Sequence, residues 1–260
     1  MNIKESKDAI QKKFEENLKG KSFKSDGYNS KHDGKEGHWV EAQLGVKHNA
    51  ANEPDLHGFE IKKQTNSKIT FGDWSPSSNI WKKKGRGKTA IKPVINKKEF
   101  LHTFGKPNVD KDNRHSWSGE PVPSRLNEYT SFGQVMRLNE KNDLVINYSF
   151  ENDKRPNKHE IIPAHLQQEN LELVKWEEEK LKQHLTRKFG QNGWVKCYKN
   201  EDGVYTGIGF APPISYEQWI EQVKEGIVFF DSGMYDGNNR QYSQWRANNK
   251  YWESLITDRR

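Results

Sequence analysis

The spacing of apolar residues along the chain predicts a series of short helices and strands. Over residues 4–18 apolar side chains recur at helical spacing and Gly20 follows, which is typical of a helix that ends there. Residues 38–45 show the same spacing over a shorter run. In residues 57–64 apolar and charged positions alternate, and residues 68–72 form a second short run. We therefore expect two strands in this part of the chain.

The later part of the chain predicts a similar mixture of elements. We expect a β-hairpin over residues 134–150 and a long helix over 165–189. Two strands over 193–199 and 203–211, a helix over 215–226 and a last strand over 227–233 should follow. The polar stretches between them are expected to be loops over residues 75–98, 105–125 and 234–252. The pattern as a whole therefore indicates a mixed α/β (α+β) fold.

Composition narrows the class of protein. Only 32% of the residues are hydrophobic, but 12% are aromatic, and side chains of this size argue against a disordered chain. The formal net charge of +7 favours an anionic partner such as nucleic acid, although many soluble proteins carry a similar excess. Cys197 is the only cysteine, which excludes an internal disulfide framework and fits a reducing compartment. Because no stretch is apolar enough to span a bilayer, we expect a cytoplasmic protein without a membrane partner.

Residues 53–64, EPDLHGFEIKKQ, carry the main candidate chemistry. On a strand, Glu60 and Lys62 lie side by side on one face, and Asp55 can approach them from the preceding turn. Two carboxylates supply the hard oxygen ligands that Mg²⁺ prefers, and a lysine beside them can help to position or activate an attacking water. Ile61, between the two charged residues, is expected to anchor the strand in the core.

Glu41 is the fourth candidate of this group. It lies on the expected helix over 38–45, whose other face is apolar, and could complete the metal shell or hold a water. The motif D-x4-E-x-K is short, however, and charged residues of this kind are also typical of a solvated strand face. From the residues alone, both interpretations stay open.

The segment GKEGHWVEAQLGVKHNAANEPDLHGFEIKKQ resembles the active-site region of the MutH-like branch of the PD-(D/E)XK nucleases. Within that branch it is most similar to restriction endonucleases of the MvaI/BcnI type. The shared features are a loop with glycines, a helix with an acidic residue before a leucine, a Pro-Asp turn and an E-I-K strand. The match covers roughly residues 34–80, and a weaker one covers residues 190–246, where strands, a helix and a polar loop follow in the family's order.

The resemblance implies a fold, a reaction and a set of site residues. We expect a PD-(D/E)XK core with a mixed sheet flanked by helices, and a second lobe that recognises DNA. The implied reaction is Mg²⁺-dependent hydrolysis of a phosphodiester bond in double-stranded DNA, which leaves 5′-phosphates, by a protein that acts as a monomer. Catalysis is assigned to Glu41, Asp55, Glu60 and Lys62, and the metal site to Asp55, Glu60 and Ile61. The expected division is a catalytic lobe over residues 1–104, a connection over 105–164 and a recognition lobe over 165–260.

Two polar segments are candidates for contacts with DNA. Residues 231–246 mix the side chains that read base edges in the major groove, namely Asp231, Tyr235, Asp236, Asn238, Asn239, Arg240, Gln241, Gln244 and Arg246. The basic run WKKKGRGK is a candidate for phosphate contacts through Lys82, Lys83, Lys84, Arg86 and Lys88. For each segment a solvated surface loop is the other interpretation.

Three functions therefore remain after the sequence is read. The first is a type II restriction endonuclease, which cuts double-stranded DNA at a specific sequence. The second is a MutH-like nicking endonuclease of mismatch repair that needs an activating partner. The third is a non-catalytic DNA-binding module, although such a module would have no use for the set Asp55, Glu60 and Lys62.

Overall fold

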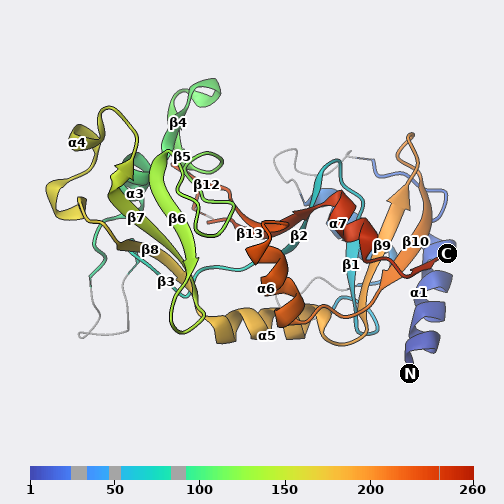
Figure 1. Cartoon of the computed structure of the whole chain (residues 1–260). Coiled ribbons are helices and arrows are strands. Elements are labelled where there is room, and N and C mark those ends of the chain that lie inside the picture. The colour runs from blue at the N-terminus through green and yellow to red at the C-terminus, as the bar shows by residue number, and fades with distance from the viewer. Residues whose placement is uncertain (25–33, 47–53, 83–91, 240) are drawn as a thin grey trace. The chain divides into compact units, whose positions relative to one another are not determined.

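The computed structural model describes residues 1–24, 34–46, 54–82, 92–239 and 241–260 and divides the chain into two units (Figure 1). The first unit consists of Met1–Ile69, Lys182–Trp219 and Asn248–Arg260, and the second of Thr70–Leu181 and Ile220–Ala247. These boundaries differ from the three consecutive segments expected from the sequence, because two later segments return to the N-terminal part of the chain.

A mixed four-stranded sheet forms the centre of the first unit. Its strands run in the order β1 (Phe59–Lys63), β9 (Gly193–Lys199), β10 (Tyr205–Ala211) and β14 (Asp258–Arg259). β1 is parallel to β9, while β10 is antiparallel to both β9 and β14. The expected strands over 57–64, 193–199 and 203–211 are all present, and the mixed sheet fits the expected fold class.

Two N-terminal helices cover one face of this sheet. They are α1 (Ile3–Asn17), which begins with a capping box between Asn2 and Glu5, and α2 (Lys35–Gln43). Their apolar residues form one core with the strands, made of Ile10, Phe14, Leu18, Val40, Leu44, Phe59, Ile61, Val195, Cys197, Tyr205, Ile208 and Phe210. The strand residues of this core alternate with Glu60, Lys62, Trp194 and Lys196, so these four side chains point to the opposite face.

The opposite face is covered by helices from the later segments of the chain. They are the part of α5 (Glu178–Phe189) that starts at Lys182, and α7 (Asn249–Ser254). Phe189 and Trp252 are fully buried there, and the Trp252 ring meets Trp194 edge to face at 4.8 Å. Helix α6 (Tyr216–Lys224) begins in the first unit and continues into the second.

The second unit is built from antiparallel strands. One sheet has the order β3 (Ser78–Asn79), β8 (Leu171–Trp176), β7 (Leu144–Asp153) and β6 (Phe132–Leu138). Another has the order β12 (Met234–Tyr235), β5 (Arg114–Trp117) and β4 (Lys106–Asn108), and a third the order β11 (Val228–Ser232), β13 (Ser243–Asn248) and β2 (Lys68–Asp73). The helices are α3 (Lys97–Phe104) and α4 (Lys158–Ile161), with 3-10 turns over Val109–Lys111 and Ala164–Leu166.

Aromatic side chains fill the core of the second unit. The Trp81 ring packs at a tilt against Phe100, with ring centres 4.2 Å apart, and Phe100 meets Trp117 edge to face at 5.2 Å. Phe230 continues this packing toward Trp245 at 5.5 Å. The aromatic content that argued against disorder is thus concentrated in close ring contacts of the kind that stabilise cores.

Four expectations about secondary structure are wrong. The expected loop over 75–98 contains the short strand β3 and the first residues of α3. Residues 171–176 form strand β8 and only residues 178–189 are helical, because the apolar side chains of LELVKW pair with the neighbouring strand β7. The expected loop over 105–125 contains β4 and β5, and the expected loop over 234–252 contains β12, β13 and most of α7. In both loops, pairing with distant strands compensates for weak local preferences.

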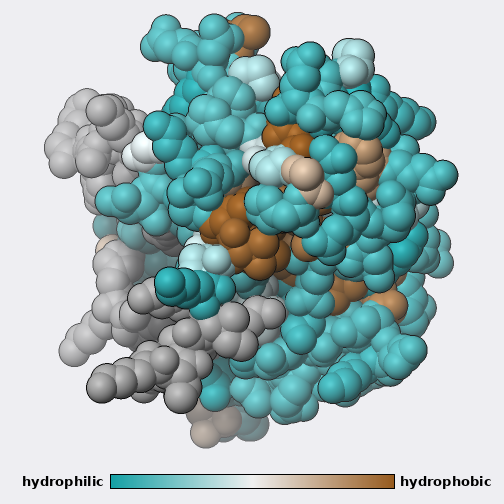
Figure 2. Space-filling view, turned by 90° about the vertical axis from the view of Figure 1, so that its left-hand side faces the viewer, coloured by the Kyte–Doolittle hydropathy of each residue, from teal (hydrophilic) through white to brown (hydrophobic). Residues whose placement is uncertain are grey.

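The face of the molecule seen in Figure 2 is largely hydrophilic. In the view of Figure 2, hydrophilic residues dominate and the hydrophobic ones are confined to a smaller area. Within the described residues, no helix combines the length and the apolar character needed to cross a membrane.

Candidate active site

Two charged residues of β1, Glu60 and Lys62, meet on the face of the sheet that α5 and α7 cover. Glu60 is 3% exposed, and its Oε1 accepts a hydrogen bond of 2.8 Å from Nζ of Lys62. This is the arrangement that strand alternation predicted for the two residues. Burial lowers the pKa of Lys62, and the Glu60 carboxylate offsets this shift only in part.

Asp55 enters the same site from the turn before β1. Its Oδ2 accepts a hydrogen bond of 2.7 Å from the backbone N–H of Ile61, which fixes the carboxylate against the strand. Burial raises the pKa of Asp55 to about 7, and the nearby negative charge of Glu60 acts in the same direction. The side chain of Ile61 is buried in the core on the other face, so its backbone carbonyl is the group left for a metal contact.

A second lysine, missed by the sequence analysis, reaches the same carboxylate. Nζ of Lys188, near the end of α5, lies 3.1 Å from Glu60 Oε1, the oxygen that Lys62 also contacts. Burial disfavours the charged form of Lys188, but the Glu60 carboxylate outweighs burial and raises the pKa. No local motif could have identified Lys188, since it lies on an amphipathic helix far from β1 in the sequence.

Glu41 lies on α2 and contributes negative charge to the site. Its charge raises the pKa of both Asp55 and Lys188. Helix α2 is held to the sheet by Glu36, whose carboxylate accepts hydrogen bonds from Lys63 at 2.7 Å, Lys199 at 2.8 Å and Tyr205 at 2.9 Å. The structure therefore brings all four expected catalytic residues into one region of the first unit.

The donor set fits a divalent cation that takes few protein ligands. Glu60 Oε2 is buried and has no hydrogen-bond partner among the described residues, while Asp55 holds a second carboxylate beside it. In the described part of the chain, no three His, Cys, Asp or Glu side chains gather closely enough to chelate an ion by themselves. Mg²⁺ binds through one or two carboxylates and keeps several waters, so this sparse set suits it.

The candidate base-reading residues lie in the second unit. Tyr235 pairs with Ser116 through β12 and β5, and the guanidinium of Arg114 lies 3.6 Å from the centre of its ring. The carboxylate of Asp236 is 3.7 Å from His102 Nε2, and the backbone carbonyl of Asn238 accepts a hydrogen bond from Lys97. These contacts fix the segment that follows β12. Asn239 is exposed and Gln241 is half-buried.

The other candidates in this segment lie on paired strands. Asp231 on β11 faces Gln244 on β13, and Nη1 of Arg246 lies 3.1 Å from the Asp231 carboxylate. Arg246 also donates to Gln244. Lys82 is exposed at the end of the described part of the basic run. The remaining candidates lie outside the described residues, namely Lys83, Lys84, Arg86, Lys88 and Arg240.

Comparison with known proteins places this geometry in a family. A family model described as LlaMI restriction endonuclease matches residues 7–259. The chain belongs to the LlaMI restriction endonuclease family. It is 44% identical over 258 residues to the type II restriction enzyme ScrFI of Lactococcus lactis subsp. cremoris, covering 94% of this chain and 95% of that enzyme. The prediction of a type II restriction endonuclease is thereby confirmed.

The fold of this family member is shared with a solved endonuclease. The structure of restriction endonuclease MvaI in complex with its cognate DNA substrate superimposes with a TM-score of 0.61 at 15% sequence identity. The match covers 99% of this chain and 98% of that chain. The expected restriction-endonuclease fold is therefore confirmed, and so is the resemblance to enzymes of the MvaI type.

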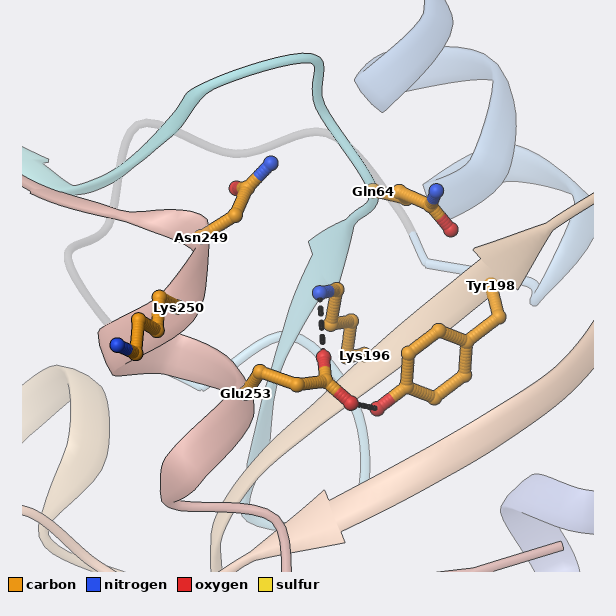
Figure 3. Close-up of a pocket in the computed structure, with 6 residues that line it drawn as sticks. All are labelled: Gln64, Lys196, Tyr198, Asn249, Lys250 and Glu253. Atoms are coloured by element: carbon orange, nitrogen blue, oxygen red, sulfur yellow. Dashed lines mark hydrogen bonds and ion pairs between the residues drawn. The ribbon is translucent and has the colours of Figure 1, made fainter.

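The endonuclease also has a pocket on the face of the sheet that carries Lys62. It has a volume of about 330 Å³ and is lined by Gln64, Lys196, Tyr198, Asn249, Lys250 and Glu253 (Figure 3). Lys196 and Tyr198 extend from β9 toward Glu253 on α7, and their polar atoms lie 2.8 and 3.0 Å from its carboxylate. Residues of the first unit alone form this pocket.

Proposed function

We propose that this restriction endonuclease binds double-stranded DNA and hydrolyses it with Mg²⁺ at the site of Asp55 and Glu60, leaving 5′-phosphates. Family membership supports the reaction class. The observation that carries the chemistry is the unequal use of the two oxygens of Glu60. Two lysines share Oε1, while the buried Oε2 has no partner among the described residues. A buried carboxylate oxygen without a hydrogen-bond partner, close to the second carboxylate of Asp55, is suited to bind a cation.

Each residue of the site has a separate role in this proposal. Asp55 and Glu60 would hold the cation, and the backbone carbonyl of Ile61 would be a third ligand. When bound, Mg²⁺ supplies positive charge at the scissile phosphate and makes an attacking water more acidic. Lys62 and Lys188 hold Glu60 in place through contacts of 2.8 and 3.1 Å to one oxygen, which would leave the other oxygen available to a cation. Lys62 orients the water, and Glu41 holds it from the side of α2.

DNA recognition is proposed for the second unit. Asp231, Gln244 and Arg246 lie on the paired strands β11 and β13, while Asp236 and Asn238 contact His102 and Lys97. Together with Tyr235, Asn239, Arg240 and Gln241 they form the proposed base-reading set. Lys82, Lys83, Lys84, Arg86 and Lys88 form the proposed phosphate-binding set, whose positive charge suits the DNA backbone.

Cleavage of plasmid DNA by purified variants tests the proposed site. Asp55→Ala and Glu60→Ala should lower the cleavage rate at least about 1000-fold while binding DNA in Ca²⁺ with unchanged affinity, because the DNA contacts lie elsewhere. Glu201→Ala, which removes an exposed carboxylate in the turn after β9, is the matched control and should cut normally. Wild-type cleavage rates in either site variant would contradict the assignment.

The digestion products distinguish the proposed function from the two alternatives. Discrete fragments formed by the protein alone, whose ends can be ligated without prior phosphorylation, are expected from a restriction endonuclease that leaves 5′-phosphates. Nicks that appear only with an added partner would support a repair enzyme, and DNA retardation without cleavage would support a binding module. Either of these results would overturn the proposal.

We further propose that the enzyme acts as a monomer in the cytoplasm. The single cysteine, Cys197, is buried, and a chain without disulfides suits a reducing compartment. Sedimentation at the concentrations used for cleavage should give the mass of one chain, 30.4 kDa. A stable dimer under these conditions would contradict the monomeric state.

A further inference from the structure

Lys62 lies against two aromatic rings that the proposed chemistry does not use. Its Nζ is 5.3 Å from the ring centre of Phe189 on α5 and 6.0 Å from that of Trp252 on α7. Both rings are fully buried, and the Lys62 side chain is only 11% exposed. An ammonium group at this distance is attracted by the ring faces, and the attraction increases when water is excluded.

The rings restrict the conformations that the lysine can adopt. A lysine side chain is a flexible stem with several accessible rotamers, and its ammonium group would otherwise favour water. With Phe189 and Trp252 on its sides, the Lys62 ammonium is directed to Glu60 at 2.8 Å. The reactive end of the lysine is thus held by the carboxylate, and its direction is set by the rings.

The position of Trp252 itself depends on how α7 is attached to the sheet. A helix of six residues is unstable alone, so its contacts determine where it lies. Trp252 Nε1 donates to the carbonyl of Ile69 at 3.2 Å, and Asn249 donates through its side chain to the carbonyl of Thr65 at 2.6 Å. The two contacts tie α7 to the start of β2 and to the connection between β1 and β2.

An ion pair between a buried lysine and a partly exposed glutamate, 34% exposed, fixes the other end of α7. Lys196 is 4% exposed, and its Nζ lies 2.8 Å from Glu253, the residue after Trp252 (Figure 3). Tyr198 also donates to Glu253 at 3.0 Å, and Arg259 contacts the same carboxylate. Displacement of Glu253 would leave the buried Lys196 ammonium without its carboxylate, so this contact resists displacement of the helix.

The register of the sheet connects this pair with the active site. Lys62 on β1 lies directly beside Lys196 on β9, and both side chains point to the same face. Each has its own carboxylate, Glu60 for Lys62 and Glu253 for Lys196. Without Glu253, the Lys196 ammonium would be a buried like charge next to Lys62 and would compete for Glu60.

From these contacts we propose that Trp252 is a positioning residue for Lys62, and that the Lys196–Glu253 pair holds Trp252 in place. Lys196 and Glu253 both line the pocket in Figure 3. The consequence for the reaction rests on the proposed function of Lys62, whereas the positioning itself does not.

Replacement of the Trp252 ring tests the proposal through the rate of the chemical step. With DNA saturated by enzyme, Trp252→Leu should slow single-turnover cleavage about 10- to 100-fold, as expected when a reacting group is displaced by about 1 Å. Trp252→Phe keeps an aromatic face and should recover most of this loss, and DNA affinity in Ca²⁺ should change less than threefold in both. Trp219→Leu is the matched control, because Trp219 is an equally buried tryptophan of the first unit on α6. It should lower the melting temperature without slowing the folded enzyme.

A spectroscopic measurement tests the geometry independently of activity. In a protein with ¹³C-labelled lysine, the Lys62 ε-methylene signal, assigned by its loss in Lys62→Met, should lie upfield because of the two rings. In Trp252→Leu it should move toward the position of an exposed lysine. Glu253→Gln, which preserves the size of the side chain, provides the second variant if Trp252→Leu does not fold, and should move the signal in the same direction.

The two levels of the proposal fail in different ways. A Lys62 signal that stays in place in both Trp252→Leu and Glu253→Gln would overturn the positioning role. Normal single-turnover cleavage in both variants, with a Lys62 signal that has moved, would overturn only the consequence of this positioning for the reaction. Normal cleavage by Lys62→Met would instead remove Lys62 from the proposed reaction while leaving the spectroscopic result intact.

Discussion

Replacing Lys188 with methionine should separate its contribution from that of Lys62. Methionine preserves the volume of the stem but removes an ammonium group that lies 3.1 Å from Glu60 Oε1. A hydrogen bond to a charged group contributes about 1.5–3 kcal/mol, which corresponds to a rate factor of roughly 10 to 100 if the bond is needed in the transition state. Single-turnover cleavage of an oligonucleotide duplex under saturating enzyme and Mg²⁺ measures this factor.

The dependence on Mg²⁺ gives a second, opposite signature. Because Lys188 places positive charge beside the proposed cation site, its removal should lower the Mg²⁺ concentration at half-maximal rate even though the maximal rate falls. Lys180→Met on the same helix is the matched control, since Lys180 pairs with Glu177 at 2.8 Å but is 52% exposed. It should leave both quantities unchanged. A Lys188→Met enzyme with a maximal rate within twofold of the wild type would refute the reasoning.

Three further predictions concern the first unit. The first concerns Glu36, whose carboxylate accepts three hydrogen bonds. Glu36→Gln should lower the free energy of unfolding by about 1–3 kcal/mol near neutral pH. Burial opposes the charged form of Glu36, but hydrogen bonds from lysines outweigh burial and lower the pKa from 4.5. The difference in unfolding free energy between wild type and variant, measured by denaturant titration, should therefore vanish as the pH falls through this lowered pKa. A difference that persists in acid would exclude this cause. Burial raises the pKa of Cys197 to about 12, so it should resist thiol reagents at pH 8 until the protein unfolds, and rapid labelling of the native enzyme would contradict its buried position. Gly193→Ala should destabilise the protein by about 1–3 kcal/mol, because φ is +100° and a Cβ would lie 2.2 Å from the carbonyl oxygen of Ala211; an unchanged melting temperature would contradict this.

The parts of the site that lie close together in sequence could be predicted from it. Alternation along 57–64 placed Glu60 and Lys62 on one face and Ile61 on the other, which strand geometry alone requires. The spacing of apolar residues placed Glu41 on a helix. Asp55 followed from its place just before the strand. In each case the relevant contact spans at most a few residues, so the local pattern contains the information.

The contacts that complete the site join segments far apart in the chain. Lys188 and Phe189 come from α5, and Trp252 comes from a segment that was expected to be loop. Nothing in the local sequence of these residues marks them as neighbours of β1, because the sheet pairing of β1 with β9 determines which later segments return to it. The long helix expected over 165–189 failed for a related reason. Its first half has helical spacing but pairs as strand β8, where tertiary contacts override local preference.

Strand β1 carries two clusters made of the same components, one on each face. On the face toward α2, Glu36 pairs with Lys63 and Lys199, and on the other face Glu60 pairs with Lys62 and Lys188. In the first cluster both carboxylate oxygens are used, since one accepts from Lys63 and the other from Lys199.

In the second cluster both lysines are directed to one oxygen, and the other is buried without a partner among the described residues. A buried acceptor in this condition costs about 1–3 kcal/mol, which a purely structural ion pair has no reason to retain. The distribution of hydrogen bonds, rather than the type of residue, therefore distinguishes the cluster that stabilises the fold from the one proposed to hold a cation.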